Sequence, residues 1–168
     1  MEIVINDTNI LIDLYNSKLL QYCKLLNFDF RTIDFVIHEI EIDEQLEAIQ
    51  KMIDEGMLKV YSLDGQTMQT VYEKKILYQD KCNVSITDIS VMVYAKENNC
   101  RLLTGDKTLR TTAEKENIKV SGIIYIIDLL MGKIDNESLL ESIELLLQTN
   151  DRLPKALIQE RIDKLKLL

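Results

Sequence analysis

Four acidic residues of this chain have the type and placement that a metal site needs. Three close short apolar runs with the character of buried strands, and one is expected to open a helix beside them: Asp7, Glu39 and Asp106 for the runs, Asp88 for the helix. Side chains at the carboxyl ends of parallel strands gather at one edge of a sheet, so we expect these acids to converge. Carboxylates within about 4 Å repel by roughly 4 kcal/mol per pair at an effective dielectric near 20. Such a cluster therefore needs protonation, pairing or a metal ion.

A divalent cation is the solution that these residue types favour. Carboxylate oxygens are hard ligands, which suit Mg²⁺ or Mn²⁺. Magnesium keeps most of its waters, which leaves positions open for phosphate oxygens. The pattern therefore favours hydrolysis of a P–O bond by water that one or two metal ions activate.

Alternating strands and helices are expected to position the acids. The predicted strands are short and β-branched or apolar, and lie at residues 3–5, 35–37, 59–63, 101–104 and 118–120. The predicted helices begin at Thr8 or Asn9 and continue over residues 42–55, 66–80, 88–98, 107–116 and 123–131. Thr87 or Asp88 is expected to cap the fourth of these helices, and Gly56 to end the second. This alternation favours a three-layer α/β/α fold with a central parallel sheet.

The end of the chain differs from this pattern. Residues 136–168 resemble two amphipathic helices broken by a segment that contains the only proline, Pro154. We expect residues 1–132 to form the α/β domain and residues 133–168 to be a C-terminal helical extension packed on it. The apolar face of the first tail helix is expected to serve packing or dimer contacts, through Leu139, Leu140, Ile143 and Leu147.

The charge is unevenly distributed along the chain. Its net value of −8 over 168 residues opposes binding of a polyanion. Residues 39–55 hold seven acids and one base, whereas residues 101–119 hold five bases and three acids. A local basic surface beside the acids is therefore expected, with Lys107 and Arg110 as the side chains that bind substrate phosphate. The alternative is that both regions are ordinary solvated helix faces.

The composition gives little support to other kinds of site. Cys23, Cys82 and Cys100 are odd in number and widely spaced, which indicates reduced thiols rather than disulfides or a zinc site. His38 is the only histidine, which leaves little material for a Ser-His-Asp triad. No segment approaches 18 apolar residues and the start lacks a basic leader, so we expect a cytoplasmic protein with no membrane segment.

Two sequence motifs resemble those of a known family. Residues 4–11 are similar to the opening of PIN domains, the nuclease fold that includes the VapC toxins of bacterial and archaeal toxin–antitoxin pairs. Residues 85–88 with Ala95, followed by residues 102–106, resemble the second signature of that family. The spacing between Asp88 and Asp106 also resembles that of the family, and the likeness covers residues 3 to about 130.

The resemblance implies a Mg²⁺- or Mn²⁺-dependent endoribonuclease. Asp7, Asp88 and Asp106 would be the metal ligands and catalytic acids. Glu39, which matches the family glutamate at the start of the helix after the second strand, would complete the metal shell or orient water. Two polar residues match positions that support such acids by hydrogen bonds rather than by ligation: Asn9 and Thr104.

The resemblance also implies partners. For a toxin these would be an RNA substrate, a small antitoxin protein that covers the acidic pocket, and a second copy in a homodimer built on helices. The C-terminal helices depart from the minimal toxin, although similar extensions occur in some PIN relatives.

Three alternatives stay open. A non-catalytic PIN-like scaffold would use the acidic pocket to dock a basic segment of a partner. A haloacid-dehalogenase-like phosphatase would need an acid where this chain has Asn9, and a receiver domain expects paired acids where Asn6 and Asp7 supply one.

Overall fold

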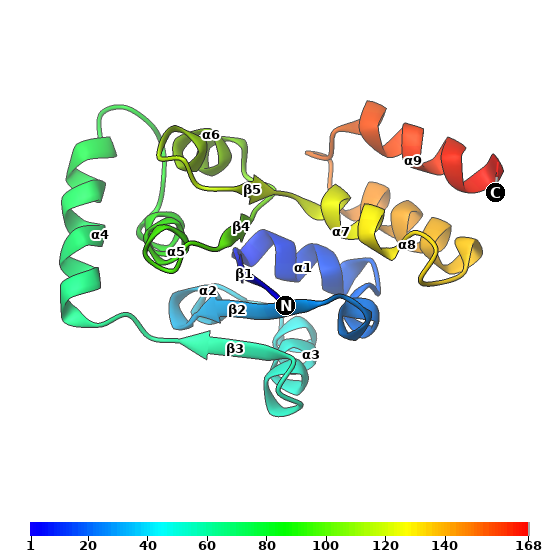
Figure 1. Ribbon diagram of the computed structural model, residues 1–168, viewed down its shortest axis with the longest axis horizontal. Coiled ribbons are helices and arrows are strands. Elements are labelled where there is room, and N and C mark those ends of the chain that lie inside the picture. The colour runs from blue at the N-terminus through cyan, green and yellow to red at the C-terminus, as the bar shows by residue number, and fades with distance from the viewer. Residues whose placement is uncertain (168) are drawn as a thin grey trace.

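A single sheet of five parallel strands organises the chain. We analysed a computed structural model, which describes residues 1–167 (Figure 1). The strands are β1 (Glu2–Asn6), β2 (Phe28–Ile33), β3 (Leu58–Tyr61), β4 (Arg101–Leu103) and β5 (Val120–Ser121). They are ordered β3-β2-β1-β4-β5, and every pairing is parallel. The predicted α/β fold with a central parallel sheet is confirmed.

Strand β1 lies at the centre of the sheet, where the strand order reverses. Val4 and Ile5 are fully buried because β1 has β2 on one side and β4 on the other. The chain builds outward from β1 to β3 first and then returns to build β4 and β5. The direction of strand order therefore reverses between β1 and β4, and ligands of open α/β sheets bind outside the carboxyl ends of the strands at such a point.

Helices cover both faces of the sheet. Their bounds are α1 (Thr8–Asn16), the 3-10 helix η1 (Leu20–Leu25), α2 (Asp34–His38), α3 (Asp43–Asp54), α4 (Gly65–Tyr78), α5 (Ile86–Glu97), α6 (Lys107–Lys115), α7 (Ile123–Leu130), α8 (Asn136–Thr149) and α9 (Lys155–Leu167). Right-handed crossovers put α1 and α3 on one face and α5 and α6 on the other. Helix α5 contacts β1, β2 and β4, while α4 packs along its outer side (Figure 1).

The second strand is where the sequence prediction was wrong. We expected it at residues 35–37, but the strand is β2, and residues 35–37 belong to the short helix α2. The polar positions of β2 disguised it: Asp29 and Arg31 are half-buried and joined by an ion pair of 2.6 Å between Oδ2 and Nη2. Because these charges pair with each other, they fit a strand that the apolar pattern did not reveal. The other predicted elements lie close to their expected bounds.

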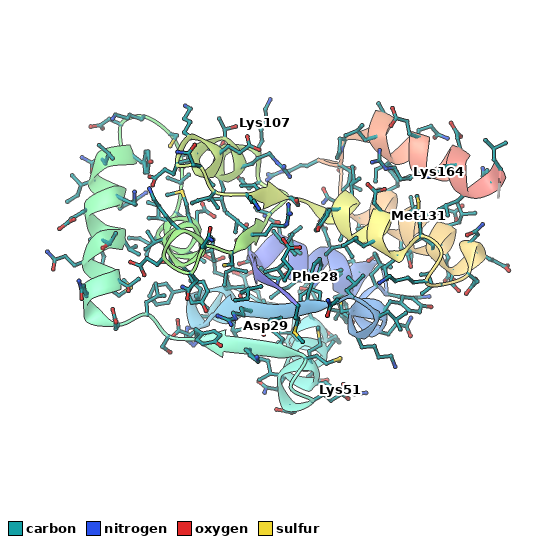
Figure 2. The ribbon with its side chains drawn as sticks, viewed as in Figure 1. Phe28, Asp29, Lys51, Lys107, Met131 and Lys164 are labelled. Atoms are coloured by element: carbon teal, nitrogen blue, oxygen red, sulfur yellow. The ribbon has the colours of Figure 1, made fainter. Side chains whose placement is uncertain are left out.

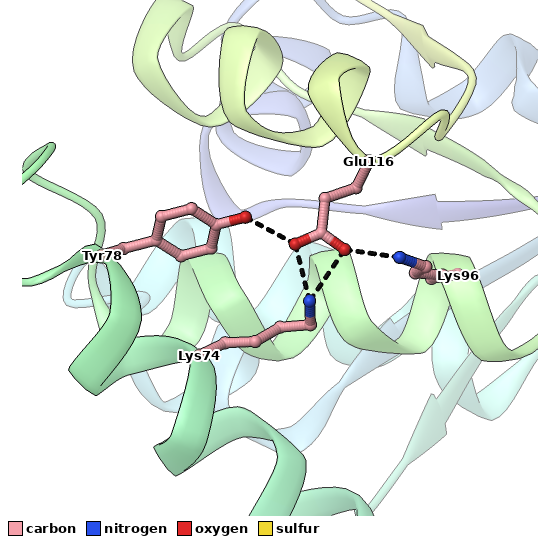
Figure 3. A network of polar contacts seen from close by, with 4 residues as sticks. All are labelled: Lys74, Tyr78, Lys96 and Glu116. Atoms are coloured by element: carbon pink, nitrogen blue, oxygen red, sulfur yellow. Dashed lines mark hydrogen bonds and ion pairs between the residues drawn. The ribbon is translucent and has the colours of Figure 1, made fainter.

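The outer helix α4 is attached to the rest of the layer by one carboxylate. Glu116, just after α6, accepts hydrogen bonds from Lys74 and Tyr78 of α4 and from Lys96 of α5 (Figure 3). The Lys74 and Lys96 ammonium groups each lie 2.6 Å from its oxygens. Burial opposes ionisation of Glu116, but these donors outweigh it and lower its pKa to about 2. The network therefore joins three helices through one ionised group.

The two C-terminal helices pack on the α/β domain. Helix α8 lies against α1 and α9, and α9 also contacts α7. Leu139 and Ile143 of α8 are fully buried, as is Ile158 of α9, while Leu140 and Leu147 pack against the core at its margin. The apolar face of α8 is therefore used for packing within this chain.

Two compositional expectations can be compared with the structure. Cys23, Cys82 and Cys100 are free thiols, and the first and last are buried. Within residues 1–167, no helix combines the length and apolar character that crossing a bilayer demands.

Candidate functional site

Asp7 lies at the carboxyl end of β1, where it also caps α1. Its Oδ1 accepts a hydrogen bond from the Thr8 backbone N–H at 2.8 Å. Its Oδ2 accepts one from the Asn9 amide at 2.9 Å and one from the Thr104 hydroxyl at 2.8 Å. The side chain is only 3% exposed. Asp7 is thus a buried carboxylate held in one orientation by three donors.

The surroundings of Asp7 disfavour its charge. Burial raises its pKa to about 6, and the nearby negative charges of Asp88 and Glu39 add to this effect. The hydrogen bond from Thr104 opposes the rise without cancelling it. A carboxylate in this position is stabilised by any cation that enters the site.

Asp106 follows β4, the strand next to β1. Its Oδ1 accepts a hydrogen bond from the Leu109 backbone N–H at 2.7 Å and so caps α6. Its own N–H donates to the Thr104 hydroxyl at 3.1 Å. Thr104 is fully buried, and its one hydroxyl therefore connects the acids at the ends of two adjacent strands.

Asn9 adds a second connection between the same strand ends. Its amide nitrogen donates to Asp7, and its Oδ1 accepts from the Gly105 backbone N–H at 2.7 Å. A Cβ on Gly105 would stand 3.3 Å from Asn9 Oδ1. A glycine therefore suits this position, because the loop after β4 passes close to α1.

Asp88 approaches the site from the first turn of α5. It is part of a capping box with Ser85: Asp88 Oδ2 accepts from the Ser85 N–H at 2.7 Å, and Ser85 Oγ accepts from the Asp88 N–H at 3.0 Å. The sequence predicted Thr87 or Asp88 as the cap of this helix, but the cap is Ser85. Burial raises the pKa of Asp88, and the charges of Asp106 and Glu39 raise it further. Asp88 therefore lies close enough to Asp106 and Glu39 to interact with their charges.

Glu39 reaches the site from the end of α2 rather than from the start of a helix. It is the C-cap residue of α2, and its side chain is exposed. The Thr8 hydroxyl donates to Glu39 Oε2 at 2.7 Å. This contact joins Glu39 to the residue next to Asp7, so the fourth acid lies at the same edge of the sheet despite the misplaced strand.

The acids gather but do not form a complete ligand set. Within residues 1–167, no group of three or more His, Cys, Asp or Glu side chains is arranged to hold a metal ion. Two physical reasons keep the carboxylates from closing on a common point. The carboxylates repel one another, and Asp7, Asp88 and Asp106 each accept a hydrogen bond from a nearby backbone N–H. Mg²⁺ is commonly held through only one or two carboxylates and retains several waters. The donor set therefore fits a hydrated ion in type and charge, and does not form a dry cage.

The two bases named from the sequence lie on α6. Lys107 is exposed at the first residue of the helix, on the surface of the molecule (Figure 2). Arg110 is half-buried, and its Nη2 donates to the Thr104 carbonyl at 3.3 Å. Both are therefore near the carboxyl end of β4, with Lys107 free of a fixed partner among the contacts described and Arg110 held in place.

A further group of residues, not predicted from the sequence, lies beside the acids. Asp13 of α1 is 5% exposed, and the Asn150 amide donates to both of its oxygens, at 3.1 and 3.0 Å. Burial raises the pKa of Asp13 to about 6. Asn150, Arg152 and Asp13 line a cavity of about 210 Å³ together with Asn9 and Asp106. Only the spacing of four between Asn9 and Asp13, which puts them on one helical face, hinted at this group.

These features define a class of protein: a parallel α/β/α domain with acids at its topological switch point. A family model described as PIN domain matches residues 3–167, and the chain belongs to this family. The family resemblance drawn from the sequence motifs is thus confirmed, and the match extends over α8 and α9.

Individual relatives are more distant. Endoribonuclease Nob1 of Methanocaldococcus jannaschii is 31% identical over 85 residues, which span 51% of this chain and 42% of that protein. VapBC-1 from nontypeable Haemophilus influenzae matches in structure with a TM-score of 0.53 and 15% identity, over 71% of this chain and 97% of the other. VapBC2 from Rickettsia felis, bound to a promoter DNA fragment, has a TM-score of 0.49 and 16% identity, over 71% and 98%. The likeness to VapBC-1 shows a shared fold, and the match to Nob1 spans less than half of that protein's length.

Proposed function

We propose that this protein is a metal-dependent endoribonuclease. The observation that carries the proposal is the gathering of Asp7, Asp88 and Asp106 at the switch point, where burial, together with the charges of neighbouring acids, raises the pKa of the first two. Membership of the PIN domain family and the partial match to an endoribonuclease support the same reaction. RNA is the proposed substrate.

Mg²⁺ or Mn²⁺ is the proposed cofactor. Asp7, Asp88 and Asp106 are the residues that would hold the ion, because their oxygens are hard and their negative charge is uncompensated by any base in the contacts described. When bound, such an ion lowers the pKa of water and stabilises charge on a phosphodiester. Because the pKa of Asp7 is raised to about 6, its side chain is ionised and able to bind a cation above that pH.

The remaining residues of the site have supporting roles in this proposal. Thr104 and Asn9 keep Asp7 in one orientation through hydrogen bonds of 2.8 and 2.9 Å. Glu39 is exposed, and the Thr8 hydroxyl orients its carboxylate, so it is suited to position water or accept a proton from it. Lys107 and Arg110 would bind the substrate phosphates beside Asp106.

RNA cleavage with a matched pair of variants tests the proposal. The purified chain should cut a fluorophore–quencher single-stranded RNA when Mn²⁺ or Mg²⁺ is added, and EDTA should stop the reaction. Asp106→Asn should reduce the rate at least about a hundredfold, because asparagine can still cap α6 but carries no charge. The control is Asp80→Asn, an exposed aspartate after α4, which should cleave normally. Equal rates for the two variants would refute the proposal.

A toxin role is the finer form of the proposal, and it derives from the resemblance to VapC toxins. A small antitoxin protein and a homodimer would accompany it. Induced expression of the chain should then arrest growth, Asp106→Asn should not, and light scattering of the purified protein should give twice the monomer mass. Unimpeded growth together with RNA cleavage in vitro would reject the toxin role and keep the nuclease.

A non-catalytic scaffold is the second candidate, and one observation favours it. Asp7 is a buried carboxylate with the negative charges of Asp88 and Glu39 nearby, and a lysine or arginine of a partner could stabilise it as a metal ion would. Calorimetric titration with Mn²⁺ separates the two functions. A scaffold should show no binding at millimolar Mn²⁺, whereas a nuclease should show saturable heat that Asp106→Asn weakens.

A further inference from the structure

A second, larger cavity lies beside the acids. It has a volume of about 520 Å³ and is bounded by the start of α6, the β5–α7 segment and the linker between α8 and α9. The smaller cavity of about 210 Å³ is lined by Asn9 and Asp106. Both are lined by the same four residues: Asp13, Gly105, Asn150 and Arg152. The two spaces are therefore neighbours that share a wall, and together they lead from the acids to the C-terminal linker.

The charges around the larger cavity are mainly positive. Lys107, Arg110 and Arg152 line it. Of the two acids in its wall, Asp128 is already bound by Arg161, whose Nε and Nη2 lie 2.9 and 2.8 Å from its oxygens. In a chain with a net charge of −8, three bases around one cleft form a local exception. This local positive charge favours a ligand with phosphate groups.

The other acid in the wall is also occupied. Asp13 accepts both hydrogen bonds of the Asn150 amide and is almost fully buried. Both of its oxygens are therefore occupied by the Asn150 amide. Neither acid is free to cancel the three bases.

Much of the remaining wall of the cavity is apolar. Ile123, Ile124, Leu153, Pro154 and Leu157 contribute to its walls. Its volume falls within the roughly 300–1,000 Å³ that is typical of small-molecule sites, so it has room for a nucleobase and its ribose. A base is available for such a pocket only when it is unpaired, as in single-stranded RNA, whose bases are recognised after they leave the stack.

The linker is fixed in a way that positions Arg152. The Asn150 side chain is anchored on Asp13 by its amide, and its Oδ1 accepts a hydrogen bond from the Arg152 N–H at 2.9 Å. Leu153, the next residue, is buried. The backbone at Arg152 is therefore held on both sides, while its side chain is exposed and free to contact a ligand.

We propose that this cleft binds an unpaired nucleotide of a single-stranded RNA next to the bond that is cut, with Arg152 contacting the phosphate and the apolar walls receiving the base. The proposal rests on the nuclease function and specifies its substrate class. It also gives the C-terminal helices a role, because the residues that wall the cleft on one side come from the linker between them. Arg152 is a binding residue that neither family motif includes.

Substitution of Arg152 tests the proposal, with an exposed lysine of η1 as the control. Binding of fluorescent single-stranded RNA to the metal-free protein should weaken about fivefold in Arg152→Ala and not in Lys24→Ala. The slope of log affinity against log salt should also fall by about 0.7 in Arg152→Ala, as expected when one phosphate contact to a single strand is lost. Arg152→Lys should restore most of the affinity. Unchanged affinity and slope in Arg152→Ala would overturn the proposal.

Two further measurements separate this proposal from the function on which it rests. Mn²⁺-dependent hydrolysis of bis(p-nitrophenyl) phosphate, which is too small to need the cleft, should occur in the wild type and in Lys24→Ala and should be lost in Asp106→Asn. Leu157→Trp, at a half-exposed position of the wall, should fill the cleft and weaken the binding of single-stranded RNA. Absence of hydrolysis in every form would reject the nuclease, whereas normal RNA binding in Leu157→Trp would reject the base pocket.

Discussion

The buried hydroxyl of Thr104 donates a hydrogen bond of 2.8 Å to Oδ2 of Asp7, although 97 residues separate the two in the chain. This contact depends on the parallel pairing of β1 with β4, in which Asn6 lies opposite Leu103. The residues that follow each strand are therefore adjacent at the carboxyl edge. The register of two strands thus sets the position of the acids.

Thr104→Val should damage both stability and activity. Valine has nearly the same shape but leaves the Asp106 N–H without a partner and removes one of the three donors to Asp7, which should reduce the free energy of unfolding by about 1–3 kcal/mol. Because the Thr104 hydrogen bond lowers the pKa of Asp7, the pH at which RNA cleavage is half-maximal should also rise. Urea unfolding and a pH–rate profile measure the two effects. Thr104→Ser should stay close to the wild type, and a valine variant that does the same would contradict this role.

Asp7→Asn should abolish cleavage without lowering thermal stability. Folding raises the pKa of Asp7 from 3.8 to about 6, so the folded state binds the proton more tightly than the unfolded state. The stability of the metal-free wild type should therefore decline as the pH rises from about 4 to 6 through this group. Asparagine removes that cost, so the Tm of Asp7→Asn should equal or exceed that of the wild type above pH 6, and the advantage should disappear below about pH 4.

Divalent metal should reverse that order. Millimolar Mn²⁺ at pH 8 should raise the Tm of the wild type and leave that of Asp7→Asn nearly unchanged, because a ligand stabilises only the state that binds it. Scanning calorimetry with and without EDTA makes the comparison. A similar increase in both proteins would show that the metal binds elsewhere.

Glu116→Gln should loosen α4. The ionised Glu116 is held by Lys74, Lys96 and Tyr78, and its folded pKa of about 2 lies below the ordinary glutamate value of 4.5 (Figure 3). Its stabilisation is therefore present at neutral pH and is lost as the pH falls from above 4.5 towards 2. At pH 7 the substitution should cost about 2 kcal/mol and increase amide exchange along α4. Glu73→Gln, at an exposed position of the same helix, is the control and should change neither quantity.

Asn150→Ala should release the linker between α8 and α9. It removes the amide that binds both oxygens of the buried Asp13, which should lower the free energy of unfolding by about 1–3 kcal/mol at pH 7. Adding Asp13→Asn to this variant should recover part of the loss, because a neutral side chain is less costly to bury. A double-mutant cycle measures the coupling, and additive effects would contradict a direct Asp13–Asn150 interaction.

Local patterns in the sequence were enough to predict most of the fold. Short β-branched runs and helical periodicity located β1, β3, β4 and the larger helices, because both patterns can be read from neighbouring residues. The strand β2 escaped this reasoning, since its paired Asp29 and Arg31 look like surface residues until their neighbours are known. The apolar residues after it instead form α2, where Val36 is buried.

The candidate site was predictable only in part. Asp7 and Asp106 follow strands, and this local feature points to one edge of the sheet. The contact between Asp13 and Asn150 joins residues 137 apart and has no local signature, so the cleft beside the acids could not be inferred. The helix that carries Glu39 was also hidden, because the assignment of α2 depends on where β2 ends.

Anomalous diffraction from a crystal soaked in Mn²⁺ tests the central claim most directly, since it reports where the metal binds without relying on activity. We predict a Mn²⁺ peak at the switch point between β1 and β4, about 2.0–2.2 Å from a carboxylate oxygen of Asp7, Asp88 or Asp106. The same soak of Asp106→Asn should give a weaker peak or none. A wild-type crystal in saturating Mn²⁺ with no peak at these oxygens would contradict the account.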